Sequence, residues 1–466
     1  MRKRPAFIIG AARSGSGKTT LTLGIVAALV KRGLNVQCFK CGPDFIDPTL
    51  HRAITSKDSY NLDLKMMGAE CCRRTYAEKS RDADVIVVEG VMGLFDGGDA
   101  STAALAKLLD LPILLIVDAS SAAESAAAVV HGFQNFDPGL TIRNVIFNNI
   151  GSPRHRQLID EAVTMRCTLD YVGFFGRDRQ YRIPERHLGL HMGSEEPLGD
   201  GGLNLLVSAV EQDLDLDVIA ALSPANSDGQ QLSEPSQIPD TAGEKKRTYR
   251  LGLALDEAFC FYYPQNLELF EQRGFEIVRF SPLHDAALPA GLDMLYFGGG
   301  YPESYGSELS RNLRMRDAIV EAHQHDLPIY AECGGFMYLC RTLKDMDGVV
   351  HQMVGLFPFA TVMNNRLRKL GYRQAQLLKD CILGARGALV RGHEFHYSDI
   401  QTEDNKPEKL KKYEHLYSLD NNSHEGYSVG SALGSYVHLH FGDSVSVIDH
   451  IYEKLAEIET LTNDQV

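Results

Sequence analysis

A glycine-rich loop near the start of the chain constrains its fold more strongly than any other feature. The loop, Ala12-Arg-Ser-Gly-Ser-Gly-Lys-Thr19, follows the short apolar run Ala6–Ile9. The stretch after it, Thr19–Arg32, has apolar residues at helical spacing and ends before Gly33. A glycine loop between a strand and a helix is the setting in which backbone N–H groups surround nucleotide phosphates. The sequence therefore predicts a parallel α/β domain with a nucleotide site.

The residue types within this loop are those that phosphate binding requires. Gly15 and Gly17 allow the backbone to turn toward oxygen atoms, and Lys18 can neutralise charge on the β- and γ-phosphates. Thr19 supplies a hydroxyl group that can hold Mg²⁺. The usual first glycine of such loops is replaced by Ala12. We predict ATP binding by five residues: Gly15, Gly17, Lys18, Thr19 and Thr20.

Acidic residues follow the second and third predicted strands, Asn35–Phe39 and Val85–Glu89. Any one of these acids is equally well explained as a turn or helix-capping residue. Together they lie at the carboxyl edge of the predicted sheet, where ligands of open α/β sheets bind. Mg²⁺ takes oxygen ligands, so this edge is a candidate metal site. The polar residues predicted at this edge are Lys40, Asp44, Asp47, Glu89 and Asp96.

Two regions of alternating strands and helices are separated by a segment of different composition. The first region continues through apolar runs such as Ile113–Asp118. Residues 223–248 are rich in Ser, Pro, Gln, Asp and Glu and have no periodicity. A second alternation begins at Tyr249–Leu255. We therefore predict an α/β protein with two doubly wound domains, residues 1–222 and 249–466, joined by a linker at residues 223–248.

A cysteine in the second region lies in a setting typical of nucleophiles. Cys333 follows the predicted strand Ile329–Ala331 and precedes two glycines, of which Gly334 is the first. A sharp strand-to-helix turn exposes the sulfur, and its backbone N–H groups can bind an oxyanion. The end of the following helix would also favour the thiolate. We predict Cys333 as a nucleophile supported by Gly334 and by Gly299, which belongs to a second glycine cluster.

The general base for this thiol is expected to be a histidine from elsewhere in the fold. His438 and His440 lie in the apolar segment Gly434–Phe441. Side chains two residues apart on a strand point to the same face. Periodicity therefore does not choose between the two histidines.

The string Arg391-Gly-His-Glu-Phe-His-Tyr397 packs polar and aromatic groups unusually densely. Two explanations are equally compatible with it: a wall of a binding site, or a polar network that braces the domain.

Composition and charge exclude several classes of function. Forty-seven basic against sixty-one acidic residues give a formal charge of −14, which argues against a nucleic-acid partner. The longest apolar runs, such as Leu111–Val117, are far shorter than the roughly 20 residues that span a bilayer. The N-terminal sequence has no secretory pattern, and the nine cysteines resemble reduced thiols. We expect a cytoplasmic protein without a membrane partner, in which Cys38 and Cys41 are packed structural residues.

Taken together, these strings resemble the cobyrinic acid a,c-diamide synthase family nearly from end to end. The resemblance implies an N-terminal domain similar to dethiobiotin synthetase and a C-terminal glutamine amidotransferase-like domain that uses a cysteine nucleophile. The motifs that carry it are Lys40-Cys-Gly-Pro-Asp-Phe-Ile-Asp47, Glu89-Gly-Val-Met-Gly-Leu-Phe-Asp-Gly97, Gly151-Ser-Pro-Arg-His155, Pro184-Glu-Arg-His-Leu-Gly-Leu190, Gly298-Gly-Gly-Tyr-Pro-Glu303, Ala331-Glu-Cys-Gly-Gly335 and Gly392-His-Glu-Phe-His-Tyr397.

The resemblance also implies an activity and its cofactors. Members of the family amidate the a and c acetate groups of a corrin-type tetrapyrrole polycarboxylate, with glutamine as nitrogen donor and one ATP for each amide. ATP, Mg²⁺, glutamine and the tetrapyrrole are therefore the expected ligands. A phosphorylated carboxylate, an acyl phosphate, is the expected intermediate. A homodimer is compatible with the resemblance but is not specified by it.

Residue roles follow from the family positions. Cys333 matches the nucleophile and His438 the histidine that increases its nucleophilicity. Many related amidotransferases carry an acid two residues after that histidine, where this chain has His440, so a dyad is expected rather than a triad. Beside the ATP-binding loop, the resemblance assigns metal binding to Thr19, Asp47 and Glu89, handling of the phosphorylated intermediate to Lys40 and Asp44, and a catalytic role to Asp96.

Three alternatives remain open on the sequence. The acceptor could be another tetrapyrrole, such as sirohaem, nickel-sirohydrochlorin or hydrogenobyrinate, because no residue distinguishes the macrocycle. The chain could instead be an ATPase switch with an inactive amidotransferase domain. A carboxylase similar to dethiobiotin synthetase is the third alternative, and it would not need Cys333.

Overall fold

The computed structural model describes residues 4–177, 185–186, 189–190, 192–193, 199–224, 247–401, 415–420, 423–442 and 445–463. The chain divides into two compact units, Met1–Pro239 and Asp240–Val466. Most of the predicted linker at residues 223–248 lies outside the described residues, as does part of the motif at residues 184–190. The two units are described separately below.

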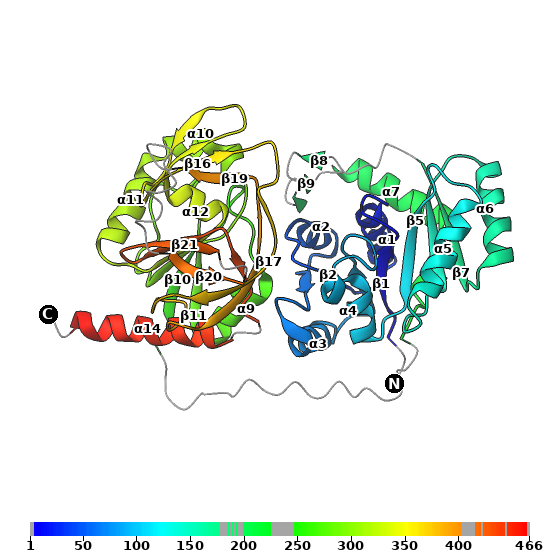
Figure 1. The fold of residues 1–466 in the computed structure, drawn as a ribbon, viewed down its shortest axis with the longest axis horizontal. Helices are drawn as coiled ribbons and strands as arrows, with labels where there is room; N and C mark the ends of the chain where they lie inside the picture. Colours follow the sequence, from blue (N-terminus) through cyan, green and yellow to red (C-terminus); the bar gives the residue numbers. More distant parts are fainter. Residues whose placement is uncertain are drawn as a thin grey trace. The chain divides into compact units, whose positions relative to one another are not determined.

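The first unit is built on a parallel sheet with strand order β3-β2-β4-β1-β5-β6-β7 (Figure 1). Its strands are β1 (Ala6–Ala11), β2 (Val36–Cys41), β3 (Tyr60–Leu62), β4 (Val85–Glu89), β5 (Ile113–Asp118), β6 (Asn144–Ile150) and β7 (Tyr171–Gly176), with the small pair β8 (Glu185–Arg186) and β9 (Gly189–Leu190). Its helices are α1 (Lys18–Lys31), α2 (Ile46–Thr55), α3 (Gly68–Lys79), η1 (Gly98–Ala100), α4 (Thr102–Leu109), α5 (Ser125–Phe136), α6 (Pro153–Arg166), α7 (Gly199–Asp213) and α8 (Leu216–Ile219).

The core of this unit explains why β1 lies at its centre. Every residue of β1 is buried, and the strand pairs with β4 on one side and β5 on the other. Alternate β1 residues pack with apolar side chains of α1, α7 and α8 on one face of the sheet. Strands that are buried on both faces are continuously apolar, as the sequence of β1 is. The loop after β1 therefore begins at the buried centre of the sheet.

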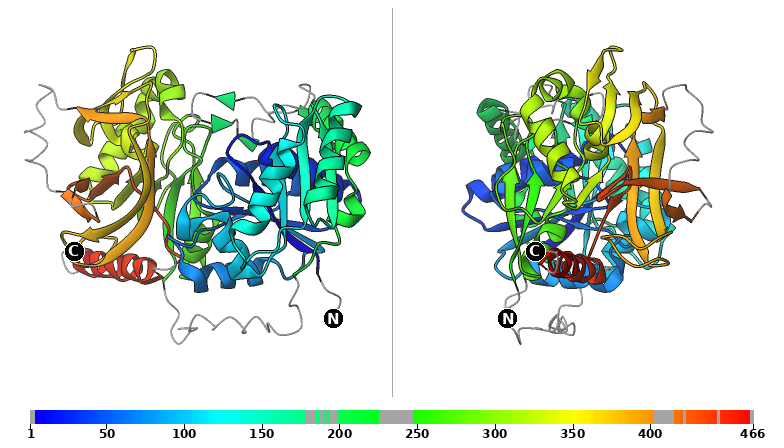
Figure 2. Two further views of the ribbon diagram at one scale, coloured as in Figure 1. Left: turned by 45° about the vertical axis from the view of Figure 1, so that its right-hand side comes forward. Right: turned by 90° about the vertical axis from the view of Figure 1, so that its left-hand side faces the viewer.

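The second unit is coloured from green through yellow to red in Figure 2. It contains a mixed sheet with strand order β11-β10-β12-β13-β22-β21-β20-β17-β18-β23 and a smaller sheet with order β15-β14-β16-β19. Its strands are β10 (Tyr249–Ala254), β11 (Phe275–Phe280), β12 (Met294–Phe297), β13 (Ile329–Glu332), β14 (Cys340–Lys344), β15 (Val350–Gln352), β16 (Phe357–Met363), β17 (Lys369–Leu377), β18 (Leu389–His396), β19 (Ser398–Gln401), β20 (His415–Leu419), β21 (His424–Val429), β22 (Ala432–Ser435) and β23 (His438–Leu439). Its helices are α9 (Pro264–Gln272), η3 (Pro302–Tyr305), α10 (Gly306–Arg311), α11 (Leu313–Gln324), α12 (Gly334–Leu339) and α14 (Val445–Asn463).

The α/β class predicted for the second unit is confirmed, and its sheet has an addition that the sequence did not indicate. Strands β11, β10, β12, β13 and β22 are parallel, as an α/β alternation predicts. From β22 to β23 the neighbouring strands are antiparallel where their register is given. This part brings the end of the chain, including β23, next to β18. In the described residues of both units, no helix has the length and apolar character needed to cross a membrane.

Candidate active site

The glycine loop after β1 has the backbone conformation that phosphate binding requires. Gly15 and Gly17 have φ values of 73° and 91°, in the left-handed region that glycine adopts without strain. A Cβ atom at Gly17 would lie 2.2 Å from the side-chain nitrogen of Asn148, so no larger residue fits there. The amide of Asn148 donates to the Ser16 carbonyl at 2.9 Å and holds the loop from β6. Asn148 was not singled out in the sequence.

Lys18 and Thr19 begin helix α1 and face the end of β4. The Lys18 ammonium donates to the carbonyl of Met92 at 2.5 Å, and the Thr19 hydroxyl donates to Glu89 Oε1 at 2.7 Å. Burial lowers the pKa of Lys18, and the positive charge of Lys40 lowers it further. Thr20 occupies the first turn of the same helix and is half-buried. The residues predicted to bind ATP are therefore neighbours around one helix N-terminus.

A buried ionic cluster joins the ends of β2 and β4. Lys40 Nζ donates to Asp47 Oδ2 at 2.5 Å, to Glu89 Oε1 at 3.2 Å and to the carbonyl of Gly90 at 3.0 Å. Burial alone would lower the pKa of Lys40, but the carboxylates of Asp47 and Glu89 outweigh it and raise that pKa. Burial would raise the pKa of Glu89, but Lys40 and His51 hold that pKa below its usual value. One ammonium group thus lies between two carboxylates.

His51 is a member of this cluster that the sequence analysis missed. Its side chain is completely buried, with Nε2 2.8 Å from Glu89 Oε2 and Nδ1 2.9 Å from the Ser59 hydroxyl. Both oxygens of Glu89 therefore have partners, which fixes the orientation of that carboxylate. His51 lies four residues after Asp47, one turn along α2, and this helical spacing is the signal that could have identified it.

The two remaining acids of this edge have different positions. Asp44 Oδ1 accepts from the backbone N–H groups of Ile46 and Asp47 at 2.7 and 3.0 Å, so Asp44 caps the start of α2. Asp96 Oδ2 accepts from the backbone of Gly93 at 3.0 Å, and its side chain is exposed. The negative charge of Asp96 opposes the lowering of the pKa of Lys18 that burial and Lys40 cause.

Cys333 lies between β13 and α12 in a strained backbone conformation. Its φ and ψ are 45° and −104°, and a non-glycine residue with such values carries a cost of about 1–3 kcal/mol. The backbone N–H of Cys333 donates to the Ser435 carbonyl at 2.7 Å, which ties the turn to β22. The predicted sharp strand-to-helix turn is confirmed. Strain of this kind persists where surrounding structure holds it, often at functional sites.

The two predicted supporting glycines lie next to this turn. A Cβ atom at Gly334 would lie 3.0 Å from the backbone nitrogen of Gly300. A Cβ atom at Gly299 would lie 2.4 Å from Cε1 of His438. The glycine cluster after β12 therefore packs between the cysteine turn and the histidine. Both positions need glycine because backbone and ring approach too closely for any side chain.

The structure distinguishes the two histidines of the late strand. His438 lies against Gly299, and its Nδ1 is 3.9 Å from Oε2 of Glu332, the residue before Cys333. The ring of His440 instead packs on Tyr263, with centroids 4.9 Å apart, and its Nδ1 accepts from the Gly442 backbone at 3.1 Å. Of the two, His438 has these contacts with residues adjoining the thiol turn.

Burial leaves the thiol and its histidines without charge. It raises the pKa of Cys333 above the usual range of a thiol. It lowers the pKa of His438 well below its usual value, and His393 and His396 lower it further. The sequence had favoured a thiolate stabilised by the helix end, but α12 is only six residues long and burial has the larger effect. Burial therefore favours the neutral form of both the Cys333 thiol and the His438 imidazole.

The string at residues 391–397 forms part of β18, which pairs with β23. His393 stacks on His438 with ring centroids 5.0 Å apart, and the hydroxyl of Tyr263 is 3.0 Å from its Nδ1. Glu394 receives a hydrogen bond from Arg373 at 2.6 Å, which braces β17 against β18. This segment therefore contributes both to the wall behind His438 and to a polar network.

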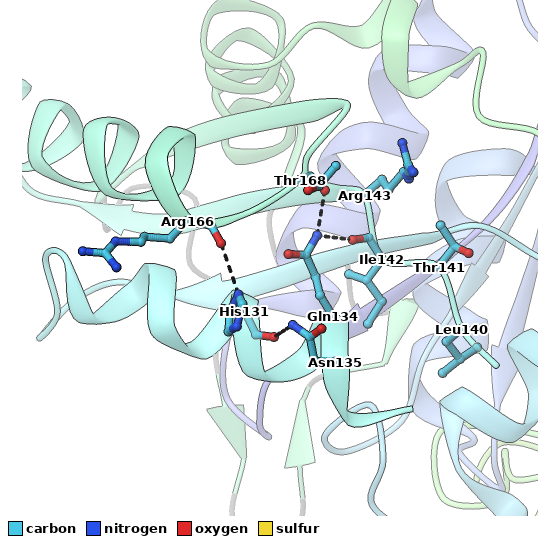
Figure 3. Close-up of a pocket in the computed structure, with 9 residues that line it drawn as sticks. All are labelled: His131, Gln134, Asn135, Leu140, Thr141, Ile142, Arg143, Arg166 and Thr168. Atoms are coloured by element: carbon cyan, nitrogen blue, oxygen red, sulfur yellow. Dashed lines mark hydrogen bonds between the residues drawn. The ribbon is translucent and has the colours of Figure 1, made fainter. Parts of the chain in front are cut away.

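Two cavities of the first unit lie away from these residues. One, of about 280 Å³, is shown in Figure 3, where Gln134 donates to the carbonyls of Ile142 and Thr168. The other, of about 810 Å³, includes Pro112 and Asn144. Pro112, Ile142, Asn144 and Thr168 precede or begin β5, β6 and β7, whereas the glycine loop follows the end of β1. Because the strands are parallel, both cavities lie at the opposite edge of the sheet from the predicted nucleotide site.

Comparisons with known proteins match both units. A family model described as the CobQ/CobB/MinD/ParA nucleotide binding domain matches residues 7–190, and one described as the CobB/CobQ-like glutamine amidotransferase domain matches residues 250–445. Cobyrinate a,c-diamide synthase of Syntrophotalea carbinolica is 43% identical over 94% of this chain and 95% of its own length. The proteins of the same name from Salmonella typhimurium and Listeria monocytogenes are 41% and 40% identical, each over 96% of this chain and over 97% and 98% of their own lengths.

Proposed function

Because the chain belongs to the cobyrinate a,c-diamide synthase family, we propose that it makes amides on the a and c acetate groups of cobyrinate, with glutamine as nitrogen donor and ATP as energy source. The observation that carries this proposal is the strained turn at Cys333 in the same chain as a phosphate-binding loop. A thiol that releases ammonia and a nucleotide that activates a carboxylate complement each other. Glutamine hydrolysis alone would not require the phosphate-binding loop, and ATP use alone would not require the thiol.

The first half of the reaction takes place at Cys333. Its sulfur attacks the side-chain amide carbon of glutamine while His438 accepts the thiol proton. Backbone N–H groups at the Gly299 and Gly334 turns stabilise the oxyanion of the tetrahedral intermediate. His438 returns the proton to the leaving nitrogen, so ammonia departs and a thioester remains. Water hydrolyses the thioester and releases glutamate.

The second half of the reaction takes place at the glycine loop. The γ-phosphoryl group of ATP passes to an acetate oxygen of the substrate, which gives an acyl phosphate and ADP. Lys18 neutralises charge on the phosphates, and Lys40 and Asp44 lie beside the intermediate. Ammonia then attacks the acyl carbon, and phosphate leaves as the amide forms. Asp96, exposed near Lys18, acts at the phosphoryl group.

The residues around Glu89 suit Mg²⁺. The Thr19 hydroxyl is 2.7 Å from Glu89, and Glu89 and Asp47 supply two carboxylates around one ammonium group. Hard oxygen ligands of this type, completed by phosphate oxygens, are the usual environment of Mg²⁺ in nucleotide sites. Thr19, Asp47 and Glu89 would hold the ion, which would neutralise charge on the phosphates. Lys40 offsets part of the negative charge of the two carboxylates before nucleotide binds.

The experiment that tests the proposal is Cys333→Ser, assayed with glutamine and, separately, with an ammonium salt. Oxygen is a far weaker nucleophile than sulfur at neutral pH, so glutamine-dependent amidation is expected to fall by about 10³-fold or more. Amidation with ammonium is expected to stay within about two-fold of the unchanged protein, since it bypasses the thiol. Loss of both activities in a folded variant would contradict this division of labour.

Mass spectrometry of the products tests the acceptor. Incubation with cobyrinate, ATP and glutamine is expected to give a product in which two carboxyl groups have become amides, seen as the corresponding decrease in mass. Conversion of sirohaem or another tetrapyrrole acid in preference to cobyrinate would contradict the proposed substrate.

A further inference from the structure

A buried acid directly precedes Cys333 at the end of β13. Glu332 is the last residue of β13, directly before Cys333, and is 2% exposed. In this chain the position two residues after His438 is His440, whose ring packs on Tyr263. A carboxylate close to His438 comes instead from β13, where Oε2 of Glu332 lies 3.9 Å from Nδ1 of His438.

The contacts of Glu332 fix both of its oxygens. Oε1 accepts from the Tyr330 hydroxyl at 2.6 Å and from the backbone of Leu439, the residue after His438, at 3.0 Å. Oε2 accepts from the Tyr296 hydroxyl at 2.9 Å and lies 3.9 Å from Nδ1 of His438. A small rotation of the imidazole ring would close that last distance to a hydrogen bond, as happens when catalytic groups tighten around substrate.

Such a carboxylate is costly to bury and serves no structural purpose that a neutral side chain could not serve. An amide of similar size could accept the hydrogen bonds of the two tyrosine hydroxyls, and an apolar group would need none. Neither would carry the cost of burying a charge. Its bond to the backbone of Leu439 also anchors the short strand β23 that carries His438. The acid thus fixes both the position of the histidine and the electrostatic environment of its Nδ1.

We propose that Glu332 is the positioning acid of the thiol site, which keeps the proton of His438 on Nδ1 and stabilises the imidazolium formed when Cys333 is deprotonated. This inference rests on the proposed role of Cys333 in glutamine hydrolysis. The thiol proton moves to Nε2 of His438, and the Nδ1 proton stays on the ring and faces Glu332. Glu332 itself neither gains nor loses a proton during the reaction.

The pH dependence of glutamine hydrolysis can separate this positioning role from a purely structural role of Glu332. Burial raises the pKa of Glu332 to about 7, although hydrogen bonds from Tyr330, Leu439 and Tyr296 lower it. The pKa values of Tyr330 and Tyr296 are raised well above their usual value, so both stay protonated near neutral pH. Burial also keeps His438 and its neighbour His393 neutral there. Within this set Glu332 is the group whose pKa lies near 7; burial also raises the pKa of Glu425 to about 7, but Glu425 accepts from Ser435 and Tyr436, so loss of the limb in Glu332→Gln distinguishes the two acids.

The test is Glu332→Gln, with glutamine hydrolysis measured from pH 5.5 to 9. The amide has the shape of the acid but no charge, so kcat is expected to fall by about 100-fold or more while KM changes less than about three-fold. The limb of the kcat profile near pH 7 is expected to disappear. Amidation with an ammonium salt is expected to stay unchanged.

Tyr330→Phe is the matched variant, because it removes one hydrogen bond from the same carboxylate and leaves its charge. Loss of that bond raises the pKa of Glu332, so the limb near pH 7 is expected to move to higher pH while the plateau kcat stays within a few-fold. This variant also carries the test if Glu332→Gln does not fold. A profile that does not move in Tyr330→Phe would overturn the proposal.

Cys333→Ser separates failure of this inference from failure of the proposed function. If Cys333→Ser stops glutamine hydrolysis while Glu332→Gln keeps the kcat and pH profile of the unchanged protein, the positioning role of Glu332 is wrong and the function stands. If Cys333→Ser still hydrolyses glutamine, the proposed function itself is wrong.

Discussion

The glycine-loop site and the thiol site manage charge in opposite ways. Around the loop, the buried Lys40 ammonium donates to Asp47 and to Glu89, and the pKa of Glu89 is held below its usual value, so paired charges are already in place at this site. Around the thiol, burial keeps Cys333 and His438 neutral. A charged nucleotide needs a site with charge already in place, whereas glutamine is bound without a net charge on its amide. In the proposed reaction, the thiol site develops charge only when the proton leaves the sulfur.

The contrast predicts that removing one charge is far more damaging in the first site. Lys40→Met leaves Asp47 and Glu89 buried without their common partner, which is expected to destabilise the first unit by about 3–5 kcal/mol. Amidation is expected to be lost with glutamine and with ammonium alike, because both need the activated carboxylate. Urea unfolding and the two amidation assays measure these effects.

Lys31→Met is the matched control for Lys40→Met. Lys31 forms an exposed ion pair with Glu211 at 2.8 Å, and such pairs are worth at most about 1 kcal/mol. The stability and the amidation activity of Lys31→Met are expected to remain close to those of the unchanged protein. Equal destabilisation by the two substitutions would refute the claim that the buried cluster is special.

At the thiol site, a change in the space around His438 is expected to affect glutamine hydrolysis. Gly299→Ala places a Cβ atom where the ring of His438 lies, since that atom would be 2.4 Å from Cε1 of the ring. Displacement of the imidazole is expected to lower kcat for glutamine hydrolysis by about 10- to 100-fold, because misplacement of about 1 Å costs this much. Amidation with ammonium is expected to be unaffected.

Gly387→Ala provides the comparison for Gly299→Ala. No atom lies within 4 Å of a Cβ at Gly387, although its φ of 91° makes alanine strained there. This variant is expected to lose some stability and to keep its glutaminase kcat. If both alanine variants slow glutamine hydrolysis equally, the contact between Gly299 and His438 is not the cause.

Acid should destabilise the unit that contains the thiol more than the unit that contains the glycine loop. Burial lowers the pKa of His393 and His440 to about 3 and that of His396 to about 4, and unfolding returns each to about 6.5. The unfolded chain then binds protons that the folded unit excludes, so this stability is present above pH 6.5 and is lost as the pH falls toward 4. Burial raises the pKa of Glu332 and Glu425 to about 7, which opposes the loss between pH 7 and 4.5 but involves fewer groups.

Calorimetry between pH 6.5 and 4.5 measures this difference. The transition of the thiol unit is expected to fall by about 5 °C more than that of the glycine-loop unit. Added ATP identifies the transitions, because a ligand stabilises only the unit that binds it. Equal shifts of the two transitions would contradict the role of the buried histidines.

Sequence reasoning located the residues that motifs mark and missed the ones that support them. The loop at Ala12–Thr19 and the turn at Cys333 were predicted because glycine, lysine and cysteine at fixed spacing have few alternative uses. Glu332 was missed because its role depends on which strands are neighbours, whereas His51 was missed although it lies one helical turn after Asp47. Glu332 contacts Leu439, which lies 107 residues later, and no local pattern indicates such a pair.

The fold was predicted to a similar extent. Apolar runs identified β1, β4 and β5 because strands buried on both faces are continuously apolar. The antiparallel strands β17 and β18 were missed, since exposed and buried residues alternate irregularly along β17. The contacts of His438 with Gly299 and Glu332 distinguish it from His440, and periodicity alone left that choice open.

The most direct test of the central claim uses Cys333→Ser with ammonium and cobyrinate whose carboxylates carry ¹⁸O. If the glycine-loop site activates the acid as an acyl phosphate without help from the thiol, each amide formed should release one phosphate that contains one ¹⁸O atom, detected by mass spectrometry. Amide formation at a normal rate with unlabelled phosphate would show that the carboxylate is not activated in this way, and would contradict the account.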